Sequence, residues 1–132
     1  HNRCRRQRQM CIRDSFPVSS EEWAEATAAA FDVLTREECN EVAKPEWWND
    51  EGLKALSARV LRAAPNEESA LDMRAVVLSG MFPAWEAGPR SAAELKEAAA
   101  HYERAAALCT APVWKADFAY NAGWCRSQAA AM

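Results

Sequence analysis

Apolar side chains recur every three or four residues through most of the chain after residue 15. This is the period of an α-helix with one buried face. Five such stripes are present, and they begin at Trp23, Leu53, Leu71, Leu95 and Phe118. The pattern predicts helices over residues 19–38, 51–64, 67–80, 91–109 and 113–130. No segment alternates apolar and polar residues for long enough to predict a strand, so we expect an all-α fold.

Polar residues before these stripes predict where the helices begin. Two segments have the spacing of a capping box, in which each of two side chains binds the other residue's backbone amide. They are Ser19-x-x-Glu22 and Ser91-x-x-Glu94. Asn49 is placed to cap the helix predicted at residues 51–64, and Asn66 is placed to cap the helix predicted at residues 67–80. Pro45, the Gly80–Pro89 segment and Pro112 interrupt the helical pattern.

An internal repeat links three parts of the chain. Pro17, Pro65 and Pro112 are spaced by 48 and 47 residues. A large apolar residue stands six positions after each proline (Trp23, Leu71, Phe118), and a small one stands ten positions after (Thr27, Ala75, Ala122). We interpret the large residue as filling a groove between helices and the small one as letting two helices approach closely. The chain is therefore predicted to form two helical hairpins and the first helix of a third.

These residues resemble the tetratricopeptide family, whose pattern begins W-x2-L-G-x2-Y. Leu71, Arg74, Ala75 and Leu78 stand at those positions after Pro65, and Phe118, Asn121, Ala122 and Cys125 stand there after Pro112. Ala98-x3-Tyr102-x2-Ala105 fits the second-helix pattern. The resemblance implies tetratricopeptide-like antiparallel helical hairpins, about two and a half units of 47–48 residues. The period exceeds the family's 34 residues, so a HEAT-type array and a non-repeat bundle stay open.

The first fifteen residues do not fit this pattern. They contain five arginines and one aspartate, and Met10 to Ser15 resembles a translated sequencing adaptor. We predict that residues 1–15 are a disordered artefact and that residues 16–132 form one helical-repeat domain or a fragment of a longer array. Residues 16–132 carry 11 basic and 18 acidic residues, a net charge of −7 compared with −3 for the whole chain.

Charge and composition exclude several classes of partner. The net negative charge of residues 16–132 repels phosphate backbones, so nucleic acid is not expected as a partner. No apolar run approaches the roughly 20 residues that a membrane span needs. The remaining cysteines, Cys39, Cys109 and Cys125, are odd in number and lack Cys-x-x-Cys spacing. This favours a reducing compartment, and we predict a cytoplasmic protein.

The sequence carries no recognisable catalytic or metal-binding pattern. His101 lies one turn after Glu97 and is predicted to form a surface pair with it. Cys109 and Cys125 lie on apolar stripes and are interpreted as small core residues. No phosphate-binding glycine motif or nucleophile motif is present. We therefore predict no enzyme activity, no metal and no cofactor.

Five residues are predicted to form a binding surface. Arg74, Asn121 and Lys115 are polar positions on helices that the family resemblance assigns to a concave face. Trp47 and Trp85 lie in the long connections, where they either fill gaps between hairpins or anchor a ligand. The predicted function is a non-catalytic scaffold that binds a peptide or partner protein with some basic character, or further repeats of the same chain. The alternative is a helical accessory fragment of a larger enzyme whose catalytic part lies outside this sequence.

Overall fold

The computed structural model describes residues 18–36, 44–81 and 84–132. In these ranges the chain forms five helices and no strand: α2 (Glu21–Leu34), α3 (Asp50–Ala63), α4 (Glu68–Ser79), α5 (Ala92–Leu108) and α6 (Pro112–Ala130). The predicted all-α fold is confirmed for this part of the chain. Residues 1–15, which the sequence predicts to be an artefact, lie outside the described residues, and so does Cys39. No helix in the described ranges is long and apolar enough to cross a membrane.

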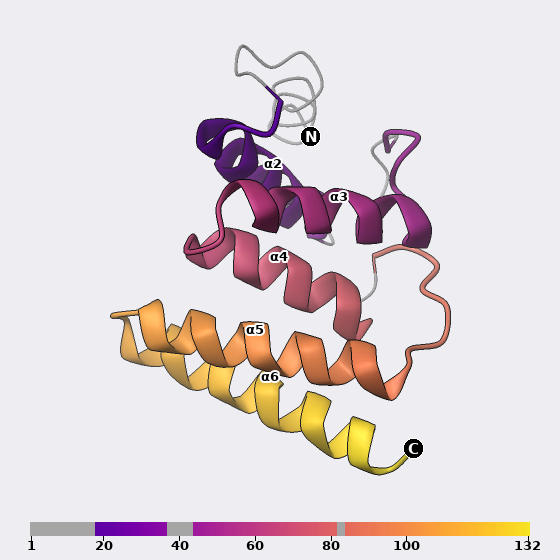
Figure 1. The fold of residues 1–132 in the computed structure, drawn as a ribbon, viewed down its shortest axis with the longest axis vertical. Helices are drawn as coiled ribbons and strands as arrows, with labels where there is room; N and C mark the ends of the chain where they lie inside the picture. Colours follow the sequence, from indigo (N-terminus) through magenta and orange to yellow (C-terminus); the bar gives the residue numbers. More distant parts are fainter. Residues whose placement is uncertain (1–17, 37–43, 82–83) are drawn as a thin grey trace.

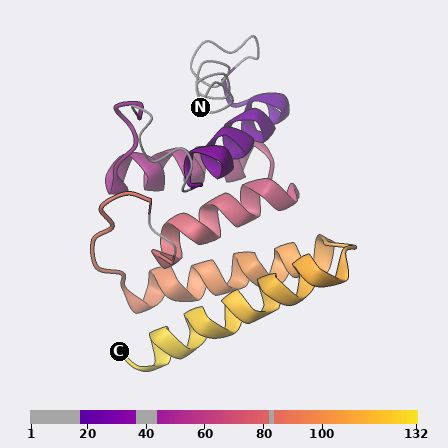
Figure 2. The ribbon, with the colours of Figure 1, turned by 180° about the vertical axis from the view of Figure 1, so that it is seen from behind.

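The helices are stacked in chain order from α2 at one end to α6 at the other (Figure 1). Helices α3 and α5 lie in front of α2 and α6 in Figure 1. From behind, α2, α4 and α6 face the viewer (Figure 2). The stack therefore has one face built by α2, α4 and α6, which are the first helices of the predicted hairpins.

The helix starts confirm two of the predicted caps and correct two. The Ser91–Glu94 capping box is present, and Asn49 Oδ1 accepts a hydrogen bond from the Gly52 amide at 2.8 Å. The first helix is capped by Ser20 and not by Ser19, because Ser19 has a φ of 72° and lies in the preceding turn. Asn66 does not cap α4. Its side chain accepts a hydrogen bond from Arg104, and Glu67 holds the N-cap position without a side-chain bond.

One part of the core joins α4, α5 and α6. It contains Ala75, Ala98, Ala99 and Ala122 together with the larger side chains of Leu71, Tyr102 and Phe118. The four alanines are at most 3% exposed. A methyl side chain at the contact lets neighbouring helices pack at short interaxial distance. Cys109 and Cys125 are free and buried in the same cluster, as predicted.

A second part of the core joins α2, α3 and α4. Trp23, Phe31, Leu53, Val60, Met73 and Val77 are buried there. Three partly buried rings from the connections pack against it: Trp47, Trp48 and Trp85. The Phe31 ring lies 5.5 Å from Trp48 and 6.1 Å from Trp85, measured between ring centroids. Aromatic pairs at these separations add stabilisation beyond the area that they bury.

Asp50 and Arg90 tie the connection after α4 to the start of α3. Two guanidinium nitrogens of Arg90 donate to the two carboxylate oxygens of Asp50 at 2.9 and 2.6 Å. Arg90 also donates to the Val77 carbonyl, and Trp85 Nε1 donates to Asp50 at 3.0 Å. Hydrogen bonds from Arg90 hold the pKa of Asp50 well below its usual range. This side-chain network fixes the long α4–α5 connection against two helices.

The buried alanines generate a stability prediction. Ala75→Leu or Ala122→Leu should force α4, α5 and α6 apart and lower the free energy of unfolding by roughly 1–3 kcal/mol. The measurement is urea denaturation followed by circular dichroism. Ala100→Leu is the matched control, because Ala100 is exposed on α5 and should change stability by less than about 0.5 kcal/mol. Equal stabilities for all three variants would contradict the close packing at residues 75 and 122.

Candidate binding groove

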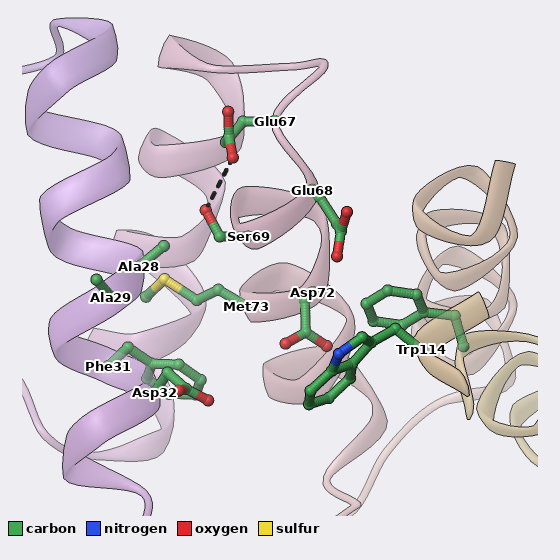
Figure 3. A pocket seen from close by; sticks show the side chains of 11 residues that line it. Ala28, Ala29, Phe31, Asp32, Glu67, Glu68, Ser69, Asp72, Met73 and Trp114 are labelled. Atoms are coloured by element: carbon green, nitrogen blue, oxygen red, sulfur yellow. Dashed lines mark hydrogen bonds between the residues drawn. The ribbon is translucent and has the colours of Figure 1, made fainter. Parts of the chain in front are cut away.

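A groove of about 480 Å³ opens on the face built by α2, α4 and α6 (Figure 3). Helix α2 contributes one wall, α6 contributes the other, and α4 lies between them. The lining residues are Ala28, Ala29, Phe31, Asp32, Glu67, Glu68, Ser69, Asp72, Met73, Trp114 and Phe118. This volume lies in the range of pockets that hold small ligands or side chains.

Apolar side chains form the inner surface of the groove. Phe31, Met73 and Phe118 are each less than 8% exposed, and they belong to the two parts of the core. Trp114 differs from them because its side chain is exposed in the first turn of α6 at 61%. The groove therefore has a rigid apolar base and one large aromatic ring at its rim.

Asp72 is the most unusual residue of the groove. It is half-buried on α4, and the described residues place neither a hydrogen bond nor an ion pair on its carboxylate. Burial, together with the negative charges of Asp32 and Glu68, raises the pKa of Asp72 to about 6. A carboxylate without a partner in such surroundings destabilises the folded chain when it is ionised.

Other carboxylates extend the negative charge along the groove. Asp32 accepts a hydrogen bond from Arg36 at 3.2 Å at the exposed edge of α2. Glu67 accepts one from the Ser69 hydroxyl at 3.4 Å. The charge of Glu67 in turn raises the pKa of Glu25, on the neighbouring helix. The lining itself holds four acidic residues and no lysine, arginine or histidine.

Arg74, the first of the predicted binding residues, is directed away from this groove. Its guanidinium donates to the Lys54 carbonyl at 2.8 Å, to Ser57 Oγ at 3.1 Å and to Glu97 at 3.3 Å. These partners belong to α3 and α5, so Arg74 bridges three helices. Glu97 also binds His101 Nε2 at 3.0 Å, which confirms the predicted Glu97–His101 pair.

Trp47 and Trp85 are packed between helices. Both lie against the α2–α3–α4 core, and the Trp48 ring contacts each of them. The Trp85 indole is further held by its hydrogen bond to Asp50. Neither side chain lines the groove. This arrangement agrees with the interpretation in which the rings fill gaps between hairpins.

Lys115 and Asn121 lie on α6 outside the groove lining. The Lys115 ammonium donates to the Ala106 carbonyl of α5 at 3.0 Å. Asn121 is half-buried and follows Trp114 by seven residues, so it lies about two turns further along the same side of α6. The five predicted residues therefore do not form one surface. Trp47 and Trp85 both contact Trp48, Arg74 bonds to α3 and α5, and Lys115 and Asn121 lie on α6.

Sequence reasoning missed the groove because its side chains come from three helices. One local signal was present: Glu68 and Asp72 stand four residues apart on one helix, an arrangement of like charges that destabilises a helix. A second was Trp114, a large ring two residues after Pro112. Neither signal indicated that Asp32, more than thirty residues earlier, would face them.

The described residues do not group three or more His, Cys, Asp or Glu side chains in a way that could hold a metal ion. Comparison with protein-family models, with curated proteins and with solved structures finds no match to this chain. The tetratricopeptide-like hairpins stay a prediction from the sequence.

Asp72 generates a prediction about stability and pH. Its folded pKa of about 6 lies above the unfolded value of 3.8, so protonation favours the folded state. This contribution should raise the stability of the chain as the pH falls from about 7 toward about 4. Asp72→Asn should stabilise the chain at about pH 7 by on the order of 1–3 kcal/mol and flatten the pH dependence in that window.

Urea denaturation at about pH 7 and about pH 5 measures both effects. Glu51→Gln serves as the control, because Glu51 is exposed on α3 and contributes nothing to the groove. An Asp72→Asn variant that is less stable than the parent chain at neutral pH would contradict the assignment of Asp72 as an unpartnered carboxylate.

Proposed function

We propose that this chain is a non-catalytic helical-repeat scaffold that binds a segment of a partner protein in the groove between α2, α4 and α6. The observation that carries the proposal is the groove itself: it has an apolar base, an exposed indole at its rim and an unpartnered carboxylate. Concave sites lined by apolar groups and a few polar ones are the usual form of a binding site.

The order of the helices supports this proposal. In a helical-repeat array the first helices of successive hairpins share one concave face, which is the face that binds partners. Helices α2, α4 and α6 are the first helices of the predicted hairpins, and all three line the groove. The sequence-based hypothesis placed the surface on the helices at residues 67–80 and 113–130. We extend it to α2 and place its centre at Asp72 and Trp114.

Trp114 has the properties of an anchor for a partner. Its ring is 61% exposed, and it stands on a helix that packs firmly against α5. A large ring with few rotatable bonds contributes much contact area at little entropic cost. Asn121, on the same side of α6, is placed to flank a bound segment. In our proposal Arg74 and Trp85 do not contact the partner. Arg74 instead holds α3, α4 and α5 together, and Trp85 packs between helices.

The test uses two exposed aromatic residues of the same helix. Trp114 lines the groove, and Tyr120, which is 74% exposed, does not. A display library of random peptides is selected on the whole chain, and the affinities of the selected peptides are measured for both variants. Trp114→Ala should weaken binding by roughly tenfold, because interface hot spots are worth more than about 1 kcal/mol. Tyr120→Ala should leave binding unchanged.

Circular dichroism provides the folding control for both variants. The proposal is overturned if the selection yields no peptide. It is also overturned if the selected peptides bind Trp114→Ala as tightly as the parent chain, because the groove would then not be the binding surface.

A further inference from the structure

We propose that the groove recognises a cationic side chain, an arginine or lysine of the bound segment, held between the Trp114 indole and the Asp72 carboxylate. This inference rests on the proposed function, and it names the chemical feature that the partner must carry. The partner is a peptide segment of another protein.

The charges that line the groove complement a cation. Asp32, Glu67, Glu68 and Asp72 line the groove, and none of the lining residues is basic. The arrangement places several like charges within one cavity, where they repel one another. A cation bound among them removes this repulsion and supplies the partner that Asp72 lacks.

The basic side chains near the groove are already bound elsewhere. Arg36 pairs with Asp32 at the outer edge, while Arg74 is held by groups of α3 and α5. Lys115 donates to a carbonyl of α5. In the described part of the chain, none of these three residues pairs with Asp72, and its carboxylate is open to a cation supplied by a ligand.

Trp114 provides the second half of the site. Figure 3 shows the Asp72 carboxylate on α4 and the Trp114 indole on α6, and both residues line the same groove. An indole face attracts guanidinium and ammonium groups through its quadrupole. A cation placed between the two groups gains a charge-assisted hydrogen bond on one side and a cation–π contact on the other.

The base of the groove favours an amino-acid side chain as the source of the cation. Phe31, Met73 and Phe118 contribute apolar surface to the lining of the same groove. The methylene stem of arginine or lysine packs against such surface while its charged end reaches a polar group. A metal ion gains nothing from contact with apolar side chains, and the described residues offer no metal-binding cluster.

The experiment compares four short-peptide libraries with randomised flanks and one fixed central residue: arginine, lysine, citrulline or norleucine. Citrulline keeps the shape of arginine without the charge, and norleucine keeps the four-carbon stem of lysine without its ammonium group. Binding to the whole chain is measured, and amide chemical shifts locate the bound peptides. The cationic libraries should bind about tenfold more strongly than their neutral counterparts and should shift amides of α2, α4 and α6.

Two groove variants and one control test the assigned residues. Asp72→Asn should reduce the advantage of the cationic libraries to near zero, and Trp114→Ala should reduce their binding about fivefold. Asp72→Asn is expected to be more stable than the parent chain, so its loss of binding cannot arise from unfolding. Glu51→Gln removes the same charge from α3 and should leave all four libraries unchanged.

The outcomes separate this inference from the proposed function. Equal binding of cationic and neutral libraries at the groove overturns the cation site and leaves the scaffold proposal standing. Absence of binding by all four libraries overturns both. Spermidine is added as a competitor, and displacement of the arginine peptides by equal concentrations of spermidine would assign the site to a free polyamine and overturn recognition of a protein segment.

Discussion

Close contact between helices through alanine is the constraint on which the rest of this structure depends. Ala75 on α4, Ala98 and Ala99 on α5, and Ala122 on α6 are all almost fully buried in one cluster. Because these side chains are single methyl groups, α5 packs closely against both α4 and α6. That packing holds α6 where Trp114 and Phe118 form one wall of the groove. The shape of the groove thus follows from small residues that do not themselves line it.

The opposite wall depends on a different kind of contact. Phe31, which lines the groove from α2, is packed against Trp48 and Trp85 from the two long connections. Trp85 is held by Asp50, and Asp50 is held by Arg90, whose side chain is only 6% exposed. Arg90 in turn packs beside Gly80, the left-handed residue that ends α4. The Arg90–Asp50 ion pair and the hydrogen bond from Trp85 to Asp50 therefore fix the Trp85 ring, against which Phe31 of α2 packs.

The sequence predicted the helices well because their signals are local. Apolar periodicity and the caps at Asn49 and Ser91 involve residues within one or two turns, and the structure agrees with them. The site was less predictable because its residues are distant in the chain. The predicted binding residue Arg74 breaks an apolar pattern for a structural reason, since it satisfies a carbonyl of α3 and carboxylate of α5. Asp72 lies outside the apolar pattern of the same helix and has no comparable partner, and only the assembled helices reveal that difference.

Asp72 connects stability with the proposed binding. A half-buried carboxylate with a raised pKa lowers the stability of the free chain at neutral pH. Natural proteins keep such destabilising groups most often where binding or chemistry needs them. A bound cation reverses the effect, because attraction to the ionised carboxylate offsets the desolvation that disfavours it. In the proposed complex, the same residue weakens the fold of the free chain and strengthens binding. Part of the proposed selectivity for a cationic partner therefore comes from removing the destabilisation that the ionised Asp72 carboxylate imposes on the free chain.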